Sequence, residues 1–204
     1  CDGWSETKEC IDELKKIKNF IFILGNHDLW VIQFYKGELT KGIFGSLYLW
    51  LTQGGEATEK SLGGIGEVDN KYLDFLESGL RYYKLDGKIF SHGDIPKCKE
   101  ELFNEIDIFN FIWSRKLVQG LKDNDIDIED SRFSEIYLGH TPVNTISKKQ
   151  DYLPLNFGNL WLLDTGAAFM GKITIMDIDT KDFYQSEKLS KLYNNERGRN
   201  KSSY

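Results

Sequence analysis

Three short polar clusters, each at the end of an apolar run, are the residues of this chain best suited to chemistry. Asn26 and His27 follow the run Phe20–Leu24, while His92 and His140 each follow a later apolar run. The sequence contains only three histidines, so all of them occupy such a position. Strands that end at one edge of a sheet would bring these side chains together. The sequence therefore predicts a single site that contains all three histidines.

The residue types in these clusters suit a divalent metal and a phosphate group. Two imidazoles and an asparagine carbonyl form a mixed nitrogen and oxygen donor set, which manganese, iron or zinc accepts. Such an ion polarises a phosphoryl oxygen and lowers the pKa of a bound water to about 7. A further histidine could protonate a leaving oxygen, and the planar guanidinium of Arg115 could hold phosphate. The structural alternatives are an ordinary turn at 26–28 and strand-end histidines that bond only to the backbone.

The elements that position these clusters are expected to alternate between helices and strands. Apolar periodicity predicts helices over 7–18, 29–35, 69–78 and 109–118, and strands over 20–24, 80–85, 88–91, 136–138, 160–163 and 172–178. The glycine-rich stretch 37–66 is expected to form loops and short helices above the site. The acidic stretch 122–132 lacks the glycine and closing glutamate of a calcium loop and is expected to be a solvated connector. We expect one α/β domain over 1–184 and a polar, frayed tail over 185–204.

Composition limits the possible partners and the compartment. The 204 residues are 40% apolar and 28% charged, as in a soluble globular protein. A net charge of −6 argues against nucleic acid or an anionic membrane as a partner. No apolar run approaches the roughly 20 residues of a membrane span, and no signal peptide is recognisable. Three irregularly spaced cysteines indicate reduced thiols, so we expect a cytoplasmic protein.

Five motifs in this chain, in their order and spacing, resemble those of the calcineurin-like metallophosphoesterases. They are Gly25-Asn26-His27-Asp28, His92-Gly93-Asp94-Ile95-Pro96, Trp113-Ser114-Arg115, Gly139-His140-Thr141-Pro142 and Asp164-Thr165-Gly166-Ala167. The chain looks most like the phosphoprotein phosphatase branch, in particular its bacterial and bacteriophage lambda type. The resemblance covers roughly residues 1–180. It implies a two-sheet α/β sandwich with a dinuclear metal centre where strand ends meet.

The resemblance also implies a role for individual residues. By motif, the ligands of the second metal are Asn26, His92 and His140, the general acid is His27, the carboxylate that orients it is Asp2, and a phosphate-binding arginine is Arg115. Cys1-Asp2-Gly3 is similar to the end of the family's G-D-x-x-D-R-G motif, with Gly3 in place of a phosphate-binding arginine. The family's D-x-H motif and first G-D aspartate would precede Cys1. The first strand and the ligands of the first metal are therefore expected to be missing from this chain.

The activity implied by the resemblance is that of a metal-dependent phosphomonoesterase. A metal-bound hydroxide would attack phosphorus. The complete enzyme would contain two divalent ions, for which manganese is the expected metal and iron or zinc are the alternatives. The expected substrate is a phosphoserine or phosphothreonine protein, or a small phosphate ester, with no nucleic-acid or membrane partner. Two alternatives stay open, namely a diadenosine tetraphosphate hydrolase and a catalytically incomplete fragment or scaffold. The oligomeric state is not indicated by the sequence.

Overall fold

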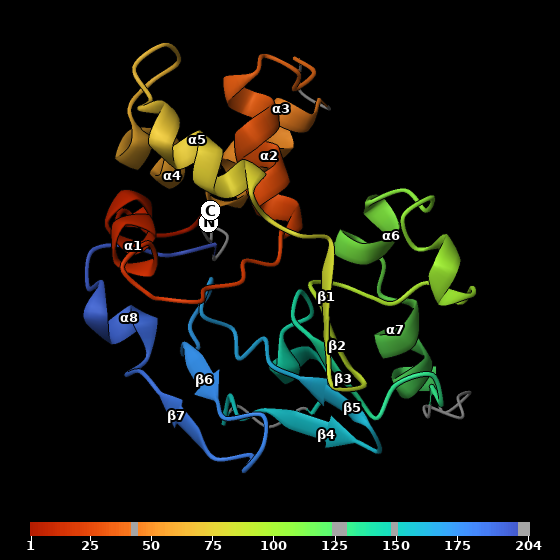
Figure 1. Cartoon of the computed structure of the whole chain (residues 1–204). Helices are drawn as coiled ribbons and strands as arrows, with labels where there is room; N and C mark the ends of the chain where they lie inside the picture. The colour runs from red at the N-terminus through yellow and green to blue at the C-terminus, as the bar shows by residue number, and fades with distance from the viewer. Residues whose placement is uncertain (42–44, 124–129, 148–150, 200–204) are drawn as a thin grey trace.

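A computed structural model describes residues 1–41, 45–123, 130–147 and 151–199 of this chain. Its helices are α1 (Thr7–Leu14), α2 (Asn26–Tyr35), α3 (Ser46–Trp50), α4 (Glu56–Leu62), α5 (Asn70–Glu77), α6 (Phe109–Ile112), α7 (Lys116–Asp123) and α8 (Leu189–Leu192), with a π-helical turn at Leu51–Gly55 and 3-10 turns at Glu100–Leu102 and Val143–Thr145. Its strands are β1 (Tyr82–Leu85), β2 (Lys88–Ser91), β3 (Glu135–Leu138), β4 (Leu155–Phe157), β5 (Leu160–Leu162), β6 (Thr174–Met176) and β7 (Phe183–Gln185). Figure 1 shows α1–α5 gathered on one side of the molecule and the strands on the other.

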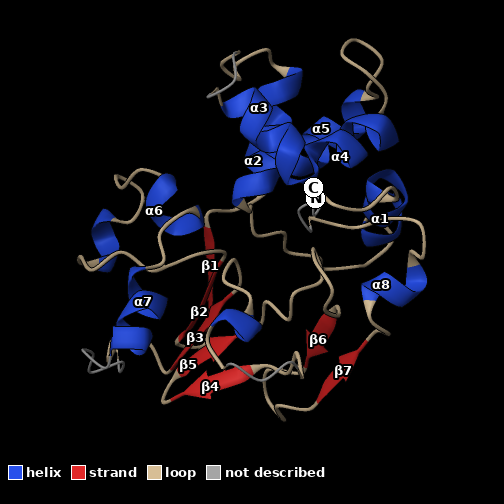
Figure 2. Cartoon of the chain, turned by 180° about the vertical axis from the view of Figure 1, so that it is seen from behind, coloured by secondary structure: helices blue, strands red, loops and turns tan. Residues whose placement is uncertain are grey.

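The strands form two sheets. A five-stranded sheet has the order β1-β2-β3-β5-β4, and β6 pairs with β7 in a separate two-stranded sheet, as Figure 2 shows from behind. The hairpin β1–β2 turns at Asp86 and Gly87, both with positive φ (48° and 77°), as a tight two-residue hairpin requires. The expectation of an α/β chain with two sheets is confirmed. Strands β4 and β7 were not foreseen from the sequence.

The parallel pairing of β2 with β3 places two candidate residues at one sheet edge. Ser91 and Leu138, the last residues of these strands, are partners in the register. His92 and His140 follow within two residues, so they leave the sheet at the same level. This is the arrangement that the sequence predicted for the strand-end histidines.

Two apolar cores lie on either side of this edge. The first packs sheet residues such as Ile89, Ile136 and Leu160 against α6 and α7. The second lies among α1–α5 and centres on side chains such as Val31 and Trp50. Three partly buried side chains, Leu29, Ile108 and Trp113, pack against both cores. The ends of β2 and β3 therefore lie where the sheet meets the helical layer.

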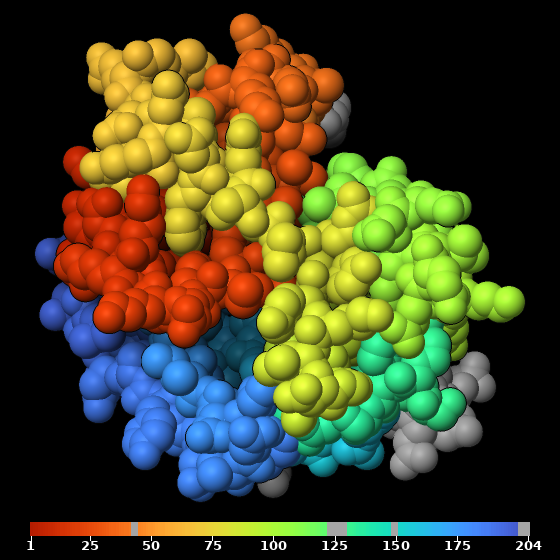
Figure 3. Space-filling view, in the orientation of Figure 1, coloured from red at the N-terminus to blue at the C-terminus, as the bar shows by residue number. Residues whose placement is uncertain are grey.

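The run Phe20–Leu24 is not a regular strand, contrary to the sequence prediction. Only Ile23 forms a bridge, parallel to Leu80, with hydrogen bonds from Leu24 N to Leu80 O and from Leu80 N to Phe22 O, each 2.8 Å. Among the described residues no strand pairs with its other side, so the ladder cannot extend. A cavity of about 350 Å³, lined mostly by apolar side chains that include Ile11, Phe22 and Ile173, lies nearby. Figure 3 shows the surface hollowed between the red N-terminal and blue C-terminal segments.

Two helices differ from their predicted bounds in ways that affect the site. Helix α2 begins at Asn26 rather than at Leu29, so the predicted loop 25–28 is a helix N-terminus. The predicted helix 109–118 is broken, because α6 ends at Ile112 and α7 starts at Lys116. Arg115 consequently lies in the break between two helices and not inside an apolar helix.

The segment after β7 is not frayed over its described part. Trp4 and Tyr193 stack with ring centroids 5.0 Å apart, and the Glu196 carboxylate accepts hydrogen bonds from Ser5 N (2.9 Å) and Ser5 Oγ (2.6 Å). In Figure 1 this blue segment returns from α8 to the N-terminal residues. Over the described part of this segment the polar composition was therefore misleading, since the carboxylate of Glu196 bonds to the N-terminal segment. The division of the chain at residue 184 stays a prediction.

Two other expectations can be stated only for the described residues. Most of the acidic stretch 122–132 lies outside them, so the proposed connector is not tested. Over the described ranges, no helix is both long and apolar enough to cross a membrane.

Candidate metal and phosphate site

The two strand-end histidines face each other beyond the edge of the sheet. The rings of His92 and His140 have centroids 4.9 Å apart and planes inclined by 57°. Gly139 N donates to His92 O at 2.9 Å, which fixes the two loops against each other. His140 has a positive φ of 62°, a conformation that is rare for a residue with a side chain. Backbone strain of this kind is common at functional sites.

Asn26, in the first turn of α2, joins this pair. The Nε2–H of His92 donates to Asn26 Oδ1 at 2.9 Å, and Asn26 is 4% exposed. The close approach depends on Gly25, because a Cβ there would lie 2.9 Å from His92 Cε1. Asp28 Oδ2 accepts the Gly25 N–H at 2.8 Å and so stabilises the start of the helix. The structure thus brings all three predicted ligands of the second metal together.

The ring of His140 presents one nitrogen without a partner. Its Nε2 is buried and has no hydrogen-bond partner among the described residues. A hydrogen bond between the ring and the backbone of Trp113 raises the pKa of His140, and with Nε2 unpartnered this bond falls to Nδ1. A histidine held in this way by one nitrogen keeps the lone pair of the other for a metal. A buried nitrogen with no partner is otherwise costly, so this atom favours a bound cation.

Both histidines are neutral at physiological pH in the metal-free protein. Burial lowers the pKa of His92 to about 4, although the charge of Asp28 opposes the shift. Burial also lowers the pKa of His140 to about 3, helped by the nearby charges of His92 and Arg115. Neutral imidazole is the form that binds metals. The neutral state of both imidazoles therefore favours metal binding over an ion pair with a carboxylate.

The residues present fit one divalent ion. The donor set is two imidazole nitrogens and one amide oxygen, which manganese, iron and zinc all accept. No carboxylate completes it, and over the described ranges no group of three or more His, Cys, Asp or Glu side chains is suited to a metal. A second ion would need a bridging carboxylate that these three residues do not supply.

His27 belongs to a different part of the site. Its Nδ1 lies 2.5 Å from Asp2 Oδ2, and both residues are buried. Trp50 Nε1 donates to the same Asp2 oxygen at 2.9 Å, and Asp2 N donates to Thr58 Oγ1 at 2.9 Å. The structure thus brings Asp2 and His27 together as the predicted dyad. Asp2 Oδ1 is buried with no partner among the described residues, and Asp2 has φ 73°.

The protonation of His27 is balanced between opposing effects. Burial lowers its pKa, the hydrogen bond that its ring donates to Asp2 raises it, and the charge of Arg199 lowers it further, with a net decrease. An anion close to the ring would raise the pKa again by favouring the charged form. His27 is therefore placed to take up a proton when a phosphate group arrives.

Arg115 lies beside His140 in the break between α6 and α7. Asp94 holds this break, since its Oδ2 accepts hydrogen bonds from Ser114 Oγ (2.5 Å) and Lys116 N (2.8 Å). Arg115 is exposed to solvent. Loss of surrounding water lowers the pKa of its guanidinium, and the charge of Asp164 opposes that shift. Burial raises the pKa of Asp164 itself.

Four residues near the site were not assigned a role from the sequence. They are Trp50, Thr58, Asp94 and Arg199. Trp50 and Thr58 come from the short helices over the site, so their general position was foreseen but their bonds to Asp2 were not. Asp94 belongs to a recognised motif. Its role as the acceptor for the Ser114 hydroxyl depends on the break between α6 and α7, which the sequence did not predict. Nothing in the sequence pointed to Arg199.

Comparison with known proteins gives a limited result. No family model matches this chain. A metallophosphoesterase structure from Sphaerobacter thermophilus aligns with 89% of this chain and 72% of its own chain, with a TM-score of 0.46 and 17% sequence identity. Values this low do not establish a common fold.

Proposed function

We propose that this chain is a metal-dependent phosphomonoesterase of the calcineurin-like type. The observation that carries the proposal is the buried Nε2 of His140, which has no partner among the described residues and lies beside the His92–Asn26 pair. Replacing the proton between His92 Nε2 and Asn26 Oδ1 by a cation would use the lone pairs of both atoms. With His140, three ligands would then hold one divalent ion.

The bound ion would supply positive charge at the phosphoryl oxygens and lower the pKa of a water molecule. The other steps belong to side chains of this chain. Arg115 would bind the phosphate oxygens with its guanidinium and orient the group. His27 would protonate the leaving alcohol, and Asp2 would orient the imidazole of His27. Trp50 and Thr58 would hold Asp2 in place through the hydrogen bonds described above.

The proposed substrate is a phosphoserine or phosphothreonine side chain, with manganese as the metal. Support comes from the motif resemblance to the phosphoprotein phosphatase branch. The exposure of Arg115 adds to it, because a phosphate carried on a protein surface can reach an exposed guanidinium. A second ion would need a carboxylate from outside the three ligands as the bridge.

A manganese-dependent activity assay tests the proposal. Turnover of nitrophenyl phosphate, a phosphoserine peptide and diadenosine tetraphosphate would be measured for the longest natural form of the chain and for its His140→Ala variant. We expect hydrolysis of the phosphopeptide that requires manganese and is lost in the variant. Preference for the dinucleotide would move the substrate assignment to the polyphosphate hydrolases. Hydrolysis that survives both chelation and His140→Ala would overturn the metal site.

A further inference from the structure

The last described residue, Arg199, reaches the candidate site from the far end of the chain. Its backbone N donates to Ala168 O at 2.7 Å, and its Nη2 donates to Cys1 O at 2.7 Å. The side chain passes over Gly3, where a Cβ would lie 3.3 Å from Arg199 Cγ. The guanidinium is therefore held against the loop that carries Asp2.

Most donors of this guanidinium have no acceptor among the described residues. The bond to Cys1 O is its only hydrogen bond to the described residues, and Nε is buried without a partner among them. No carboxylate oxygen in the described ranges lies within ion-pair distance of it. A guanidinium has five N–H donors, and a buried donor left unpaired costs free energy. An oxyanion with several acceptor oxygens would satisfy these donors together.

The charge of Arg199 acts on the same residues as the proposed chemistry. It lowers the pKa values of both His27 and His92. Burial lowers the pKa of Arg199, opposed by the charges of Asp2, Asp164 and Asp28. Arg199 lies on the side of the His27–Asp2 dyad, because its guanidinium bonds to Cys1 and its side chain passes Gly3, the two neighbours of Asp2.

The segment that carries Arg199 is docked by contacts that have no part in catalysis. Tyr193 stacks on Trp4 and bonds through its hydroxyl to Glu6, while Glu196 binds Ser5. The indole of Trp4 in turn donates to Ala167 O at 2.8 Å, next to the residue that anchors Arg199. These contacts fix the backbone on both sides of the N-terminal loop. They give the arginine a defined position, which a phosphate-binding residue needs.

We propose that Arg199 is a second phosphate-binding residue of the site, delivered by the docked segment 193–199, and that it binds the phosphate dianion opposite Arg115. The inference deepens the proposed phosphomonoesterase function and rests on it for the identity of the anion. Two guanidiniums on opposite sides favour a terminal phosphate, whose three free oxygens can meet both, over a diester. A merely structural arginine would tie the segment to Cys1 and leave anion affinity unchanged.

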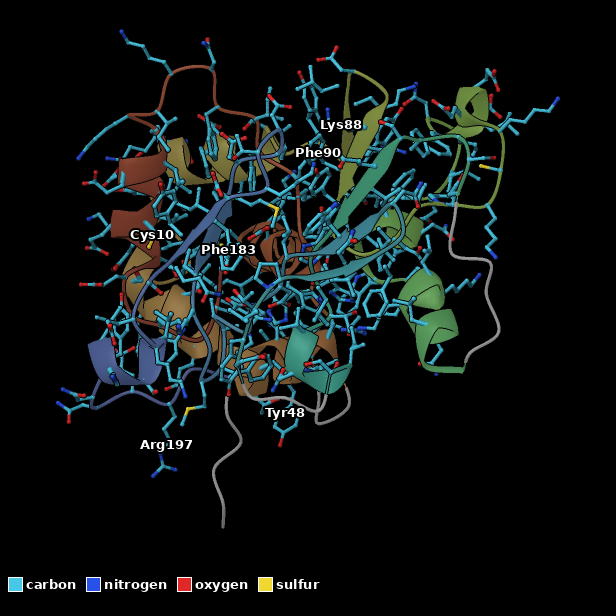
Figure 4. All side chains as sticks on the ribbon, turned by 90° about the horizontal axis from the view of Figure 1, so that it is seen from below. Cys10, Tyr48, Lys88, Phe90, Phe183 and Arg197 are labelled. Carbon is cyan, nitrogen blue, oxygen red and sulfur yellow. The ribbon has the colours of Figure 1, made fainter. Side chains whose placement is uncertain are left out.

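Phosphate binding by the 204-residue chain tests this assignment. Calorimetric titration with inorganic phosphate would compare the wild type with Arg199→Gln, Arg199→Lys and the control Arg197→Gln. Arg197 is exposed and projects away from the molecule in Figure 4. We expect Arg199→Gln to weaken binding about 10- to 100-fold, the usual weight of a charge-assisted bidentate contact, and Arg199→Lys to weaken it less. Arg197→Gln should bind as the wild type does.

A measurement on the wild-type chain tests the proposal even if a variant fails to fold. The Nε–H resonance of Arg199 in the wild-type chain should shift on addition of phosphate, and saturating phosphate should raise the melting temperature. Unchanged affinity in a folded Arg199→Gln variant, a resonance that does not move, or no phosphate binding by the wild type would each overturn the proposal. Phosphate binding through Arg199 without any manganese-dependent turnover would instead reject the proposed catalysis and leave this anion site standing.

Discussion

The candidate site has two halves that are built in different ways. His92 and His140 leave adjacent parallel strands whose last residues are in register, so the sheet, together with the bond from Gly139 N to His92 O, sets their separation. His27 and Asp2 come from a helix N-terminus and a loop, and they depend on contacts with Trp50 and Thr58. The comparison indicates that the sheet half fixes the two histidines proposed as metal ligands. The helical half positions the dyad proposed for proton transfer and, at the start of α2, the third proposed ligand, Asn26.

The largest expected effect concerns the sheet half. In the longest natural form of the chain, His92→Ala and His140→Ala should each lower manganese affinity by at least about 100-fold, more than the 10- to 100-fold loss typical of a residue that only supports a ligand. Phosphatase activity should be lost with the metal. The check is metal content by mass spectrometry after loading and desalting, with His27→Asn as a matched histidine control that keeps its ion. Equal metal loss in the control would erase the distinction between the halves.

The next effect concerns the helical half. His27→Asn should keep its metal and lose about 10²–10⁴ in turnover, the usual weight of a general acid. The loss should shrink for nitrophenyl phosphate, because its leaving group needs little protonation. Asp2→Asn should share the defect, since it removes the carboxylate that orients His27. A constant loss across leaving groups of different pKa would argue against proton transfer by His27.

A third prediction concerns Asp94, which holds the break between α6 and α7. Asp94→Ala should lower the free energy of unfolding by about 3 kcal/mol, because it leaves the Ser114 hydroxyl and the Lys116 N–H without their acceptor. Urea denaturation measures this directly. Asp179→Ala, at a side chain 84% exposed, is the control and should change stability by less than about 0.5 kcal/mol. A similar small change in Asp94→Ala would show that Asp94 does not hold the helix break.

The last prediction concerns the pH dependence of the metal-free protein. Burial lowers the pKa of His92 to about 4 and the pKa of His140 to about 3. Between pH 6.5 and these values, the two histidines are protonated in the unfolded chain and neutral in the folded chain. Stability should therefore be complete above pH 6.5 and fall as the pH decreases, by about 1.4 kcal/mol per pH unit for each histidine. Urea unfolding from pH 7 to pH 4.5 in the presence of chelator gives the slope. His140→Gln should reduce it, and an unchanged slope would contradict the neutral, buried state of His140.

The sequence was informative where local pattern and topology act together. Apolar runs that end at His92 and His140 predicted strand-end positions, and parallel pairing made the two histidines neighbours. The run before Asn26 predicted a third strand of the same kind, but only one bridge forms there, and Asn26 is positioned by a helix start instead. Hydrophobic periodicity specifies which residues are buried, and the hydrogen-bonding partner of a strand depends on the rest of the chain.

The rest of the site depends on contacts between distant segments. Arg199 reaches Cys1 because Ala168 anchors its backbone and because Tyr193 and Glu196 bind the N-terminal residues. A polar composition does not distinguish a frayed segment from one whose polar groups find partners across the molecule. The bonds of Asp2 to Trp50 and Thr58 likewise join segments about fifty residues apart, a relation that no local pattern encodes.

Imidazole nitrogen NMR on a zinc titration tests the central claim most directly, because the chain has only three histidines and zinc is diamagnetic. The account predicts that zinc shifts the Nε2 resonances of His92 and His140 together, at one ion per chain. The Nδ1 resonance of His27 should keep the position set by its bond to Asp2. Zinc shifts confined to His27, or shifts that spread equally over all three rings without saturating at one ion, would contradict a metal site formed by Asn26, His92 and His140.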